Sequence, residues 1–406
     1  MRHRRRIIFG SAVAFIAITM SILCVPIPSA LRQSPLGTLT LLDVRGREIA
    51  QLASPEARVQ MPIELAQMGE WLPRVTVALE DHRFYEHAAV DWSATVAAGV
   101  RNAKSRRIVS GASTITQQLV KMASERQHRS WSAKIYETIV AWKIERRWSK
   151  QHILAEYLNR SSYGNRRLGP EAAARAYFGK SARDLTLAES VFLAGLPQAP
   201  TRLNPWLHSA EATRKYERSL VRLTQLSVVT PEQQTLLASS APIARRFDPP
   251  RIASHFVDAV VAQHPSLRGR VPTSLDLDLQ NEAERCVRMH LAALNRDDIS
   301  EAALVIVDNE TGAVRAMVGS SNYALHQSNG ATLSRSCGST LKPFVYLAAL
   351  DRHLLTAASL LPDTADAIRE EYADYDPQNY NHRYLGPVRL REALGCSLNV
   401  PAVYAL

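Results

Sequence analysis

The chain has 406 residues, 46% of them hydrophobic and 21% charged, a composition that excludes an intrinsically disordered protein. This length allows roughly two or three domains, each with its own core. Lys and Arg outnumber Asp and Glu by 49 to 38, and this positive charge suits nucleic acid, anionic lipid headgroups or phosphorylated substrates without deciding among them.

The N-terminus predicts a membrane anchor. The basic start, MRHRRR, is followed at 7–25 by 19 residues without a charge. As a helix this segment is about 28 Å long, enough to cross the hydrocarbon core of a bilayer. The basic flank predicts a cytoplasmic N-terminus and places the rest of the chain outside. A cleaved signal peptide is the alternative, but Pro28 stands where cleavage after Ala30 needs a small residue.

The pattern of apolar residues then changes along the chain. Residues 38–52 alternate and turn at Arg45–Gly46, which predicts a short hairpin. From 62 to about 225 the pattern is mainly helical. Within it, residues 130–149 place Ile135, Ile139 and Trp142 on one helical stripe, with Ser132 as the candidate N-cap.

The last third of the chain predicts a second domain. Residues 302–320 read as two strands joined by a turn at 309–312, and residues 339–350 as the start of a helix. We therefore divide the chain into a basic tail and anchor at 1–25, a linker with a hairpin at 26–60, a helical domain at 61–225, a linker at 226–300 and a further domain at 301–406.

The cysteines predict no metal site. Cys24, Cys286, Cys337 and Cys396 show no metal-ligand spacing. We expect unpaired, buried thiols, with a disulfide between Cys337 and Cys396 as the alternative.

Three segments between 78 and 205 carry the polar clusters. ALEDHRFYEHAAVDW (78–92) places adjacent carboxylates beside two histidines, and STITQQ (113–118) has three hydroxyls and two amides in six residues. So dense a set of hydrogen-bonding groups matches a sugar or a phosphate. The alternative for STITQQ is an exposed polar turn.

Together these segments resemble the glycosyltransferase domain of class A penicillin-binding proteins, which polymerise lipid II into glycan strands of peptidoglycan. The motifs are EDHRFYEH, GASTITQQLVK, AKIYE, KQHILAEYLN and LTLAESVFLAGLPQAPTRLNP, in the order of the family and across about residues 61–206. The ending LPQAPTRLNP is most similar to the penicillin-binding protein 1C subgroup. The resemblance implies a mainly α, lysozyme-like fold for this domain.

The resemblance also implies the roles of the site residues. Glu80 is the base that takes the proton of the acceptor hydroxyl, and Glu137 is the second carboxylate, near the pyrophosphate. Lys134 lies three residues before Glu137 on the same helical face, and with Lys121 it meets phosphate. The residues expected to bind sugar or phosphate oxygens are Ser113, Thr114, Gln117 and Gln118. The residues expected to support the loop around the base are Asp81, Arg83, Phe84 and His87.

Four positions depart from the pattern of the family. Ala89 and Ala112 replace glycines, which reduces backbone freedom, and Met122 replaces an Asn. Ala133 stands where the family has an Arg before Lys134, which removes one cation directed at phosphate. Because both glutamates are present, we expect an active enzyme.

The second domain carries an acyl-transfer pattern. Ser339 and Lys342 form an SxxK motif within GSTLKPF, and Ser397 and Asn399 form SLN, which resembles the penicillin-binding transpeptidase domain. The third element of that domain, Lys-Thr-Gly on a strand, does not occur within residues 1–406. We therefore expect a partial α/β fold without transpeptidase activity.

The sequence thus predicts a multidomain peptidoglycan glycosyltransferase anchored by one span in the bacterial cytoplasmic membrane, with its domains on the outer side. Its partners would be lipid II, the growing glycan chain, membrane lipid and other cell-wall enzymes. We expect no bound metal or organic cofactor, and a divalent cation would enter with the substrate pyrophosphate. The alternatives are a non-catalytic paralogue that binds lipid II or scaffolds other cell-wall enzymes, and a nucleic-acid-binding protein, the latter disfavoured by the anchor.

Overall fold

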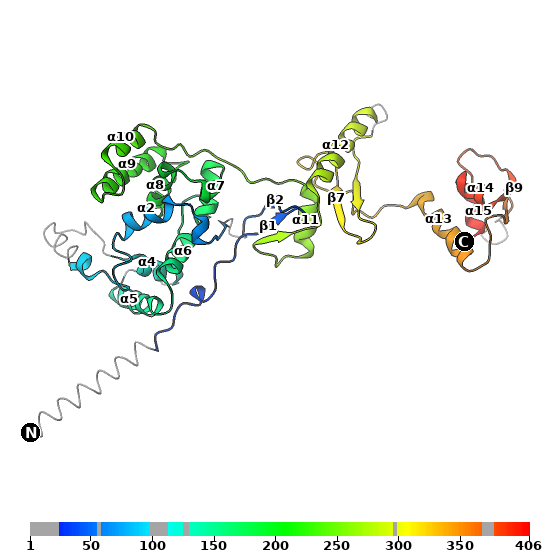
Figure 1. The fold of residues 1–406 in the computed structure, drawn as a ribbon. Coiled ribbons are helices and arrows are strands. Elements are labelled where there is room, and N and C mark those ends of the chain that lie inside the picture. The colour runs from blue at the N-terminus through cyan, green and yellow to red at the C-terminus, as the bar shows by residue number, and fades with distance from the viewer. Residues whose placement is uncertain (1–23, 55–57, 97–112, 125–129, 295–298, 368–376) are drawn as a thin grey trace, which may run out of the picture. The chain divides into compact units, whose positions relative to one another are not determined.

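The computed structural model describes residues 24–54, 58–96, 113–124, 130–294, 299–367 and 377–406. The chain forms two compact units, residues 1–331 and 332–406 (Figure 1). None of the helices in the described ranges has both the length and the apolar character needed to cross a bilayer. The predicted anchor at 7–25 lies outside these ranges except for its last two residues.

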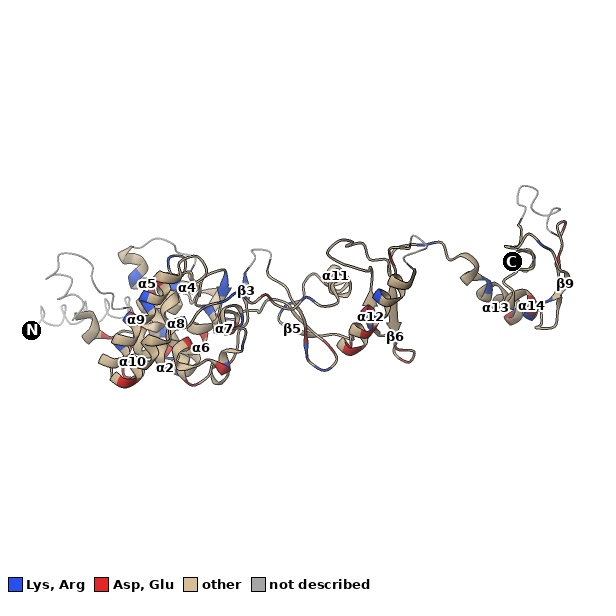
Figure 2. Ribbon diagram, turned by 90° about the horizontal axis from the view of Figure 1, so that it is seen from above, with Lys and Arg blue, Asp and Glu red and all other residues tan. Residues whose placement is uncertain are grey.

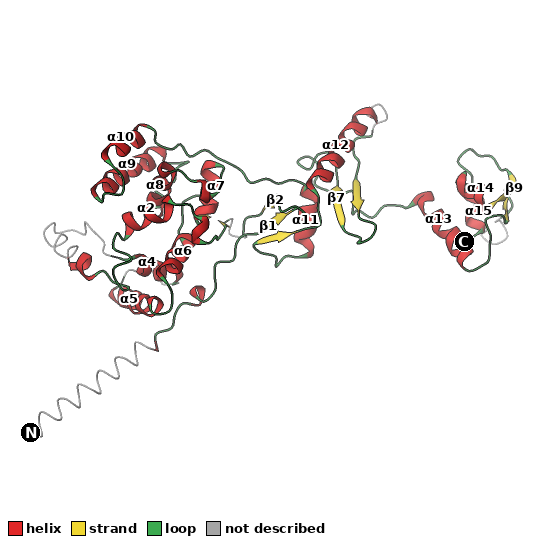
Figure 3. Ribbon diagram, in the orientation of Figure 1, coloured by secondary structure: helices red, strands yellow, loops and turns green. Residues whose placement is uncertain are grey.

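Most of the first unit is a body of helices, drawn in red in Figure 3. Its helices are α2 (Trp71–Glu80), α4 (Ile115–Ala123), α5 (Trp131–Glu145), α6 (Lys150–Arg160), α7 (Pro170–Phe178), α8 (Leu187–Gly195), α9 (Ser209–Gln225) and α10 (Pro231–Ser239). Short 3-10 turns lie at Ser29–Leu31, Leu65–Gln67, Ala182–Asp184 and Leu196–Gln198. One apolar core contains side chains of α2, α7, α8 and α9. A second core contains side chains of α2, α4, α5 and α6. The mainly helical pattern predicted for 62–225 is therefore present.

Hydroxyl side chains cap several of these helices and so fix where they begin. The caps are Thr114 on α4, Ser130 on α5, Ser149 on α6, Thr186 on α8 and Thr230 on α10. Each accepts a hydrogen bond from a backbone N–H of the first turn, which otherwise lacks a partner within the helix. The prediction of Ser132 as the cap of α5 is wrong. Ser130 accepts the Ala133 N–H at 3.1 Å, and Ser132 lies inside the first turn.

A small mixed sheet brings two distant parts of the first unit together. Strand β1 (Thr40–Leu42) pairs antiparallel with β2 (Glu48–Gln51), which confirms the predicted hairpin, and parallel with β5 (Arg270–Pro272). The sheet packs on α11 (Ser254–Gln263) around the fully buried Leu41 and Ile49. The segments predicted as linkers, 26–60 and 226–300, therefore share an apolar core, because burying these side chains together removes them from water.

The remainder of the first unit contains a second hairpin. Strands β6 (Leu304–Val307) and β7 (Val314–Val318) pair antiparallel, as predicted, with Gly312 at φ +71° in the turn. Helix α12 (Leu277–Leu294) packs on β7. Strands β3 (Val59–Gln60) and β4 (Arg167–Leu168) form a short parallel pair beside the helical body.

The second unit combines helices with a two-stranded sheet. It contains the 3-10 turn η6 (Gly338–Leu341), α13 (Lys342–Asp351), β8 (Leu360–Asp363), β9 (Gly386–Arg389), α14 (Leu390–Gly395) and α15 (Asn399–Tyr404). Its core surrounds Tyr346, Leu361 and Val388. All four cysteines are free thiols, and Cys24, Cys337 and Cys396 are exposed, so the expectation that they are buried is wrong.

Candidate active site

Glu80 is the last residue of α2. The helix ends there because Asp81 leaves the helical region, with φ at −158°. The half-buried Glu80 carboxylate accepts one hydrogen bond among the described contacts, from Gln118 Nε2 on α4 at 3.1 Å. Its second oxygen therefore has no hydrogen-bonded partner in the described part of the chain, which leaves it able to accept a proton from a bound group.

Asp81, in contrast, uses both of its oxygens internally. The side chain is buried, accepts the backbone N–H of Ile115 at 3.0 Å and lies 2.9 Å from His87 Nε2. The first of these bonds ties the loop after α2 to the start of α4. Asp81 therefore joins the loop after α2 to α4 and to His87, and the supporting role of these two residues stays a prediction.

Arg83 and Phe84 also stabilise the loop that follows α2. Arg83 Nε donates to Asp91 Oδ2 at 3.0 Å, and its terminal nitrogens contact Asp91 and Ser93. Burial raises the pKa of Asp91, but the hydrogen bonds from Arg83, the Ala94 N–H and Ser93, together with the charge of Arg83, outweigh burial and lower the pKa of Asp91 to about 2. Phe84 is fully buried, with Lys150 Nζ 4.4 Å from its ring centre.

Asp81, His87 and Asp91 also lie within reach of a single ion, since one ligand atom of each falls within 4.8 Å of the others. Their donor atoms, however, already have partners. Asp81 bonds Ile115, and the Arg83 guanidinium, itself a cation, occupies Asp91. We interpret these three residues as a brace for the loop and assign no metal to them.

The N-terminal half of α4 is built from the polar STITQQ segment. Thr114 and Gln117 form a capping box, and Thr114 Oγ1 also donates to the Ala89 carbonyl at 2.6 Å. Both side chains are at most 3% exposed. The segment is therefore not an exposed polar turn. Ala89 has φ at +63°, a conformation that glycine adopts more readily.

Gln117 links α4 to α5 and to the second carboxylate. Its Nε2 donates to Thr138 Oγ1 at 3.0 Å, and its Oε1 accepts from Lys134 Nζ at 3.2 Å. Lys134 also donates to Ser113 Oγ at 2.8 Å and forms an ion pair with Glu137 at 3.2 Å. The predicted i, i+3 pair on α5 is thus present.

The two glutamates are therefore linked to neighbouring residues of α4, Glu80 directly and Glu137 through Lys134. Glu80 is bonded to Gln118, and Glu137 is joined through Lys134 to Gln117. The Tyr157 hydroxyl, on α6, donates to Gln118 Oε1 at 3.3 Å. Of the predicted residues, Lys121 lies exposed in the last turn of α4, apart from this chain of contacts.

Lys215, on α9, is a further charged residue near Glu80 that the sequence did not reveal. Its side chain runs against Gly195 of α8, where a Cβ would lie only 3.1 Å from Lys215 Cγ. Burial lowers the pKa of Lys215, and the negative charge of Glu80 acts in the opposite direction. No motif marks Lys215, because its proximity to Glu80 arises from the packing of α9 on α2.

A second polar cluster lies in the second unit. Lys342 Nζ donates to the Ser397 carbonyl and to Asn399 Oδ1, both at 2.6 Å, and to Ser397 Oγ at 3.2 Å. Burial lowers the pKa of Lys342. Ser339 lies exposed on η6, with its carbonyl bonded to the Lys342 N–H. Three of the four predicted residues are thus in direct contact.

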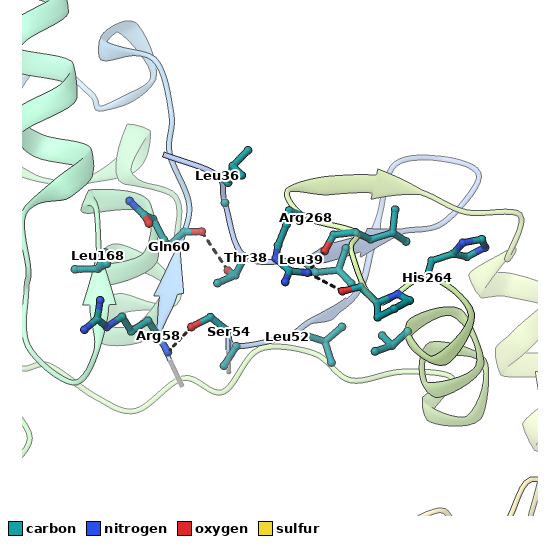
Figure 4. Close-up of a pocket in the computed structure, with 15 residues that line it drawn as sticks. Leu36, Thr38, Leu39, Leu52, Ser54, Arg58, Gln60, Leu168, His264 and Arg268 are labelled. Carbon is teal, nitrogen blue, oxygen red and sulfur yellow. Dashed lines mark hydrogen bonds between the residues drawn. The ribbon is translucent and has the colours of Figure 1, made fainter. Parts of the chain in front are cut away.

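A cavity of about 480 Å³ lies elsewhere in the first unit, between the small sheet, α11 and β4 (Figure 4). Its lining is mostly apolar, with Arg58 and Arg268 among its polar residues. Arg268 donates to the carbonyls of Pro265 and Leu267. None of the predicted site residues lines this cavity, so the candidate chemistry is not located there.

Comparisons with known proteins find relatives among the penicillin-binding proteins. Residues 45–224 match the family model described as transglycosylase, and residues 302–405 match that of the penicillin-binding protein transpeptidase domain. Penicillin-binding protein 1C of Escherichia coli is 32% identical over 89% of this chain and 46% of its own length. Penicillin-binding protein 1F of Bacillus subtilis is 29% identical over 90% of this chain and 52% of its own.

A solved structure supports the fold. The crystal structure of penicillin-binding protein 1A from Haemophilus influenzae superimposes with a TM-score of 0.52 at 20% identity, covering 92% of this chain and 61% of that one. The chain spans about half the length of the curated relatives it matches.

Proposed function

Because the chain belongs to the class A penicillin-binding protein family, we propose that its helical body is a peptidoglycan glycosyltransferase that polymerises lipid II. The observation that carries this proposal is the chain of contacts from Glu80 through Gln118 and Gln117 to Lys134 and Glu137. This chain of contacts links Glu80, whose carboxylate has one oxygen without a hydrogen-bonded partner in the described part of the chain, to Lys134, whose ammonium can bind phosphate.

In the proposed reaction, Glu80 takes the proton from the 4-hydroxyl of the acceptor sugar as that oxygen attacks the anomeric carbon of the donor. The bond from that carbon to the lipid pyrophosphate breaks at the same time. Lys134 is 40% exposed, so its ammonium can stabilise the negative charge that develops on the leaving pyrophosphate. Glu137 orients Lys134 before substrate binds. This two-carboxylate arrangement suits transfer with inversion.

The remaining site residues take supporting roles in this proposal. Ser113 and Gln118 are placed to reach sugar or phosphate oxygens, while Thr114 and Gln117 hold the start of α4 and the position of Lys134. The second unit carries the residues of a penicillin-binding acyl-transfer cluster, with Ser339 in the place of the nucleophile and Lys342 in that of its base, and no transpeptidase activity is part of this proposal. Residues 7–25 anchor the chain in the cytoplasmic membrane, with both units outside.

The test is polymerisation of lipid II by the purified chain. We expect Glu80→Gln to lower the rate by about 10²–10⁴-fold, the usual effect of losing a general base, and Glu137→Gln to lower it as well. Glu86→Gln is the control, because Glu86 is an exposed carboxylate of the same loop, and it should leave the rate unchanged. Lipid II binding without polymer from the unmodified chain would contradict the proposal and favour a non-catalytic binder.

A further inference from the structure

The cavity of about 480 Å³ in the first unit lies outside the candidate active site. Its walls come from residues next to β1 and β2, Leu39 and Leu52, from Val261 on α11 and from Leu168 on β4 (Figure 4). Segments that are distant in the sequence therefore meet around it. Its volume lies within the range of about 300–1,000 Å³ that is usual for sites of small molecules.

The walls of the cavity are aliphatic and only partly covered. Leu52, Leu168, Val261 and Leu267 are half-buried, and Leu36 is 74% exposed. No Phe, Tyr or Trp occurs among the described residues that line the cavity. A ligand with an aliphatic chain would remove the remaining surface of these side chains from water, which favours its binding.

The neutral polar side chains of the lining are already bonded within the chain. The Thr38 hydroxyl donates to the Gln60 carbonyl at 3.1 Å, and Gln60 Nε2 donates to the Asn159 carbonyl at 3.1 Å. Ser54 Oγ accepts the Arg58 N–H at 3.2 Å. A sugar needs several free donors and acceptors, so this lining does not suit a sugar.

The charged groups of the lining are cationic. Arg58 and Arg268 line the cavity together with His264, and no carboxylate occurs among its described lining residues; Figure 2 marks the two signs of charge along the chain. The Arg58 guanidinium has no bonded partner in the described part of the chain. One terminal nitrogen of Arg268 donates to the carbonyls of Pro265 and Leu267, at 3.0 and 2.6 Å. These bonds fix the guanidinium and leave its other N–H groups available for an anion.

We propose that the cavity binds an amphipathic anion with one aliphatic chain and a carboxylate, that is, a fatty acid. The chain lies against the leucines and Val261, and the carboxylate pairs with the exposed Arg268, whose planar guanidinium matches its geometry. Arg58 adds positive charge on the side of β4. Because the walls belong to the small sheet, α11 and β4, the bound ligand holds these elements together. This site does not depend on the proposed glycosyltransferase function.

The site is tested by photolabelling the full chain, in a neutral detergent, with a fatty acid that carries a diazirine group. Mass spectrometry of the digested chain locates the label, which we expect in peptides that contain 36–54 and 261–268. Excess unlabelled laurate should displace it. Dodecanol and dodecylammonium are the matched controls, because they have the same chain length without a negative charge, and they should leave the labelling unchanged.

Three variants separate charge from shape. Arg268→Gln should raise the laurate concentration needed for half displacement about tenfold, the usual loss for one charged hydrogen bond, and Arg58→Gln should raise it less. Val261→Phe fills the cavity without changing its charge and should abolish the labelling of these peptides. Arg183→Gln is the control, because Arg183 is an exposed arginine of the helical body that does not line the cavity, and it should leave displacement by laurate unchanged.

Equal displacement by dodecanol and laurate would overturn the proposal, since the cavity would then accept a chain regardless of charge. The same holds for label that is spread evenly over the chain or is insensitive to Val261→Phe. If Val261→Phe lowers the fraction of cross-linked dimer while no label maps to the cavity, the cavity instead contacts a second copy of the chain. Displacement by laurate is measured on the unmodified chain, so it decides the question even where a variant fails to fold.

Discussion

Three carboxylates close to one another along the chain, Glu80, Asp81 and Asp91, differ in their environment and so in their roles. Asp81 accepts bonds on both oxygens, and Asp91 is held by the Arg83 guanidinium and the N–H of Ala94. Glu80 accepts a single bond among the described contacts, from Gln118. A fully bonded carboxylate loses stabilising contacts when it is protonated, whereas Glu80 keeps an oxygen for a substrate proton.

Asp91 should make the stability of the helical body depend on acid pH. Its pKa of about 2 in the folded chain lies below its usual value of 3.8, so the stabilisation is complete above about pH 4 and is lost as the pH falls toward 2. In Asp91→Asn this part of the pH dependence should disappear, and stability near neutral pH should also fall because Arg83 loses its partner. Urea unfolding between pH 2 and 6 measures both effects.

The matched control for Asp91→Asn is Asp184→Asn, which alters an exposed aspartate of the same helical body. This variant should keep the slope of the unmodified chain. An identical slope in Asp91→Asn and the unmodified chain would show that the pair with Arg83 does not persist in solution.

Among the secondary-structure elements, α4 connects most of the candidate site. Its cap, Thr114, contacts Ala89 in the loop after α2, and its first two turns carry Gln117 and Gln118. A substitution at the start of α4 should therefore disturb both the loop after Glu80 and the Lys134–Glu137 ion pair on α5.

Thr114→Ala should lower both stability and activity. The loss of the capping bond should reduce the free energy of unfolding by about 0.5–2 kcal/mol, and polymerisation should slow because Gln117 and Gln118 are less firmly positioned. Thr230→Ala is the matched control. Thr230 caps α10 with the same capping box, so its loss should lower stability without slowing polymerisation. Equal rates for the two variants would argue against a positioning role for α4.

The same elements show how much the sequence could predict. The spacing of Lys134 and Glu137 and the helical period of 130–149 were enough to place this pair on one face of a helix. Periodicity also grouped Ile135 with Trp142, but it could not tell that this face is exposed while Val140 and Ile144 are buried. That distinction depends on which side of α5 meets α4 and α6.

Contacts between segments that are distant in the sequence could not be predicted either. The pairing of β1 with β5 and the approach of Lys215 to Glu80 join residues more than a hundred positions apart. No local pattern encodes them. The motifs therefore predicted the residue types of the candidate site and its two separate clusters, whereas its internal bonds, such as Lys134 to Gln117, required the fold.

At the scale of the whole molecule, the two units have separate cores and separate polar clusters. The boundary falls between Ala331 and Thr332, and the next residues, up to the SxxK motif, are exposed and largely without regular structure. Arg335 lies in this stretch. Exposed backbone with few packed neighbours is where proteases cut first.

Trypsin should therefore cleave the folded chain early after Arg335 and release the C-terminal unit. Because the core around Glu80 and Glu137 lies wholly in the first unit, the N-terminal fragment should keep its rate of lipid II polymerisation. Mass spectrometry of the first fragments identifies the cut, and Arg335→Gln should delay it without changing the rate. Faster cleavage within 226–300 would mean that the small sheet, rather than the boundary at 331, is the weakest part of the chain. Loss of polymerisation on cleavage after Arg335 would instead show that the first unit depends on the second for its activity.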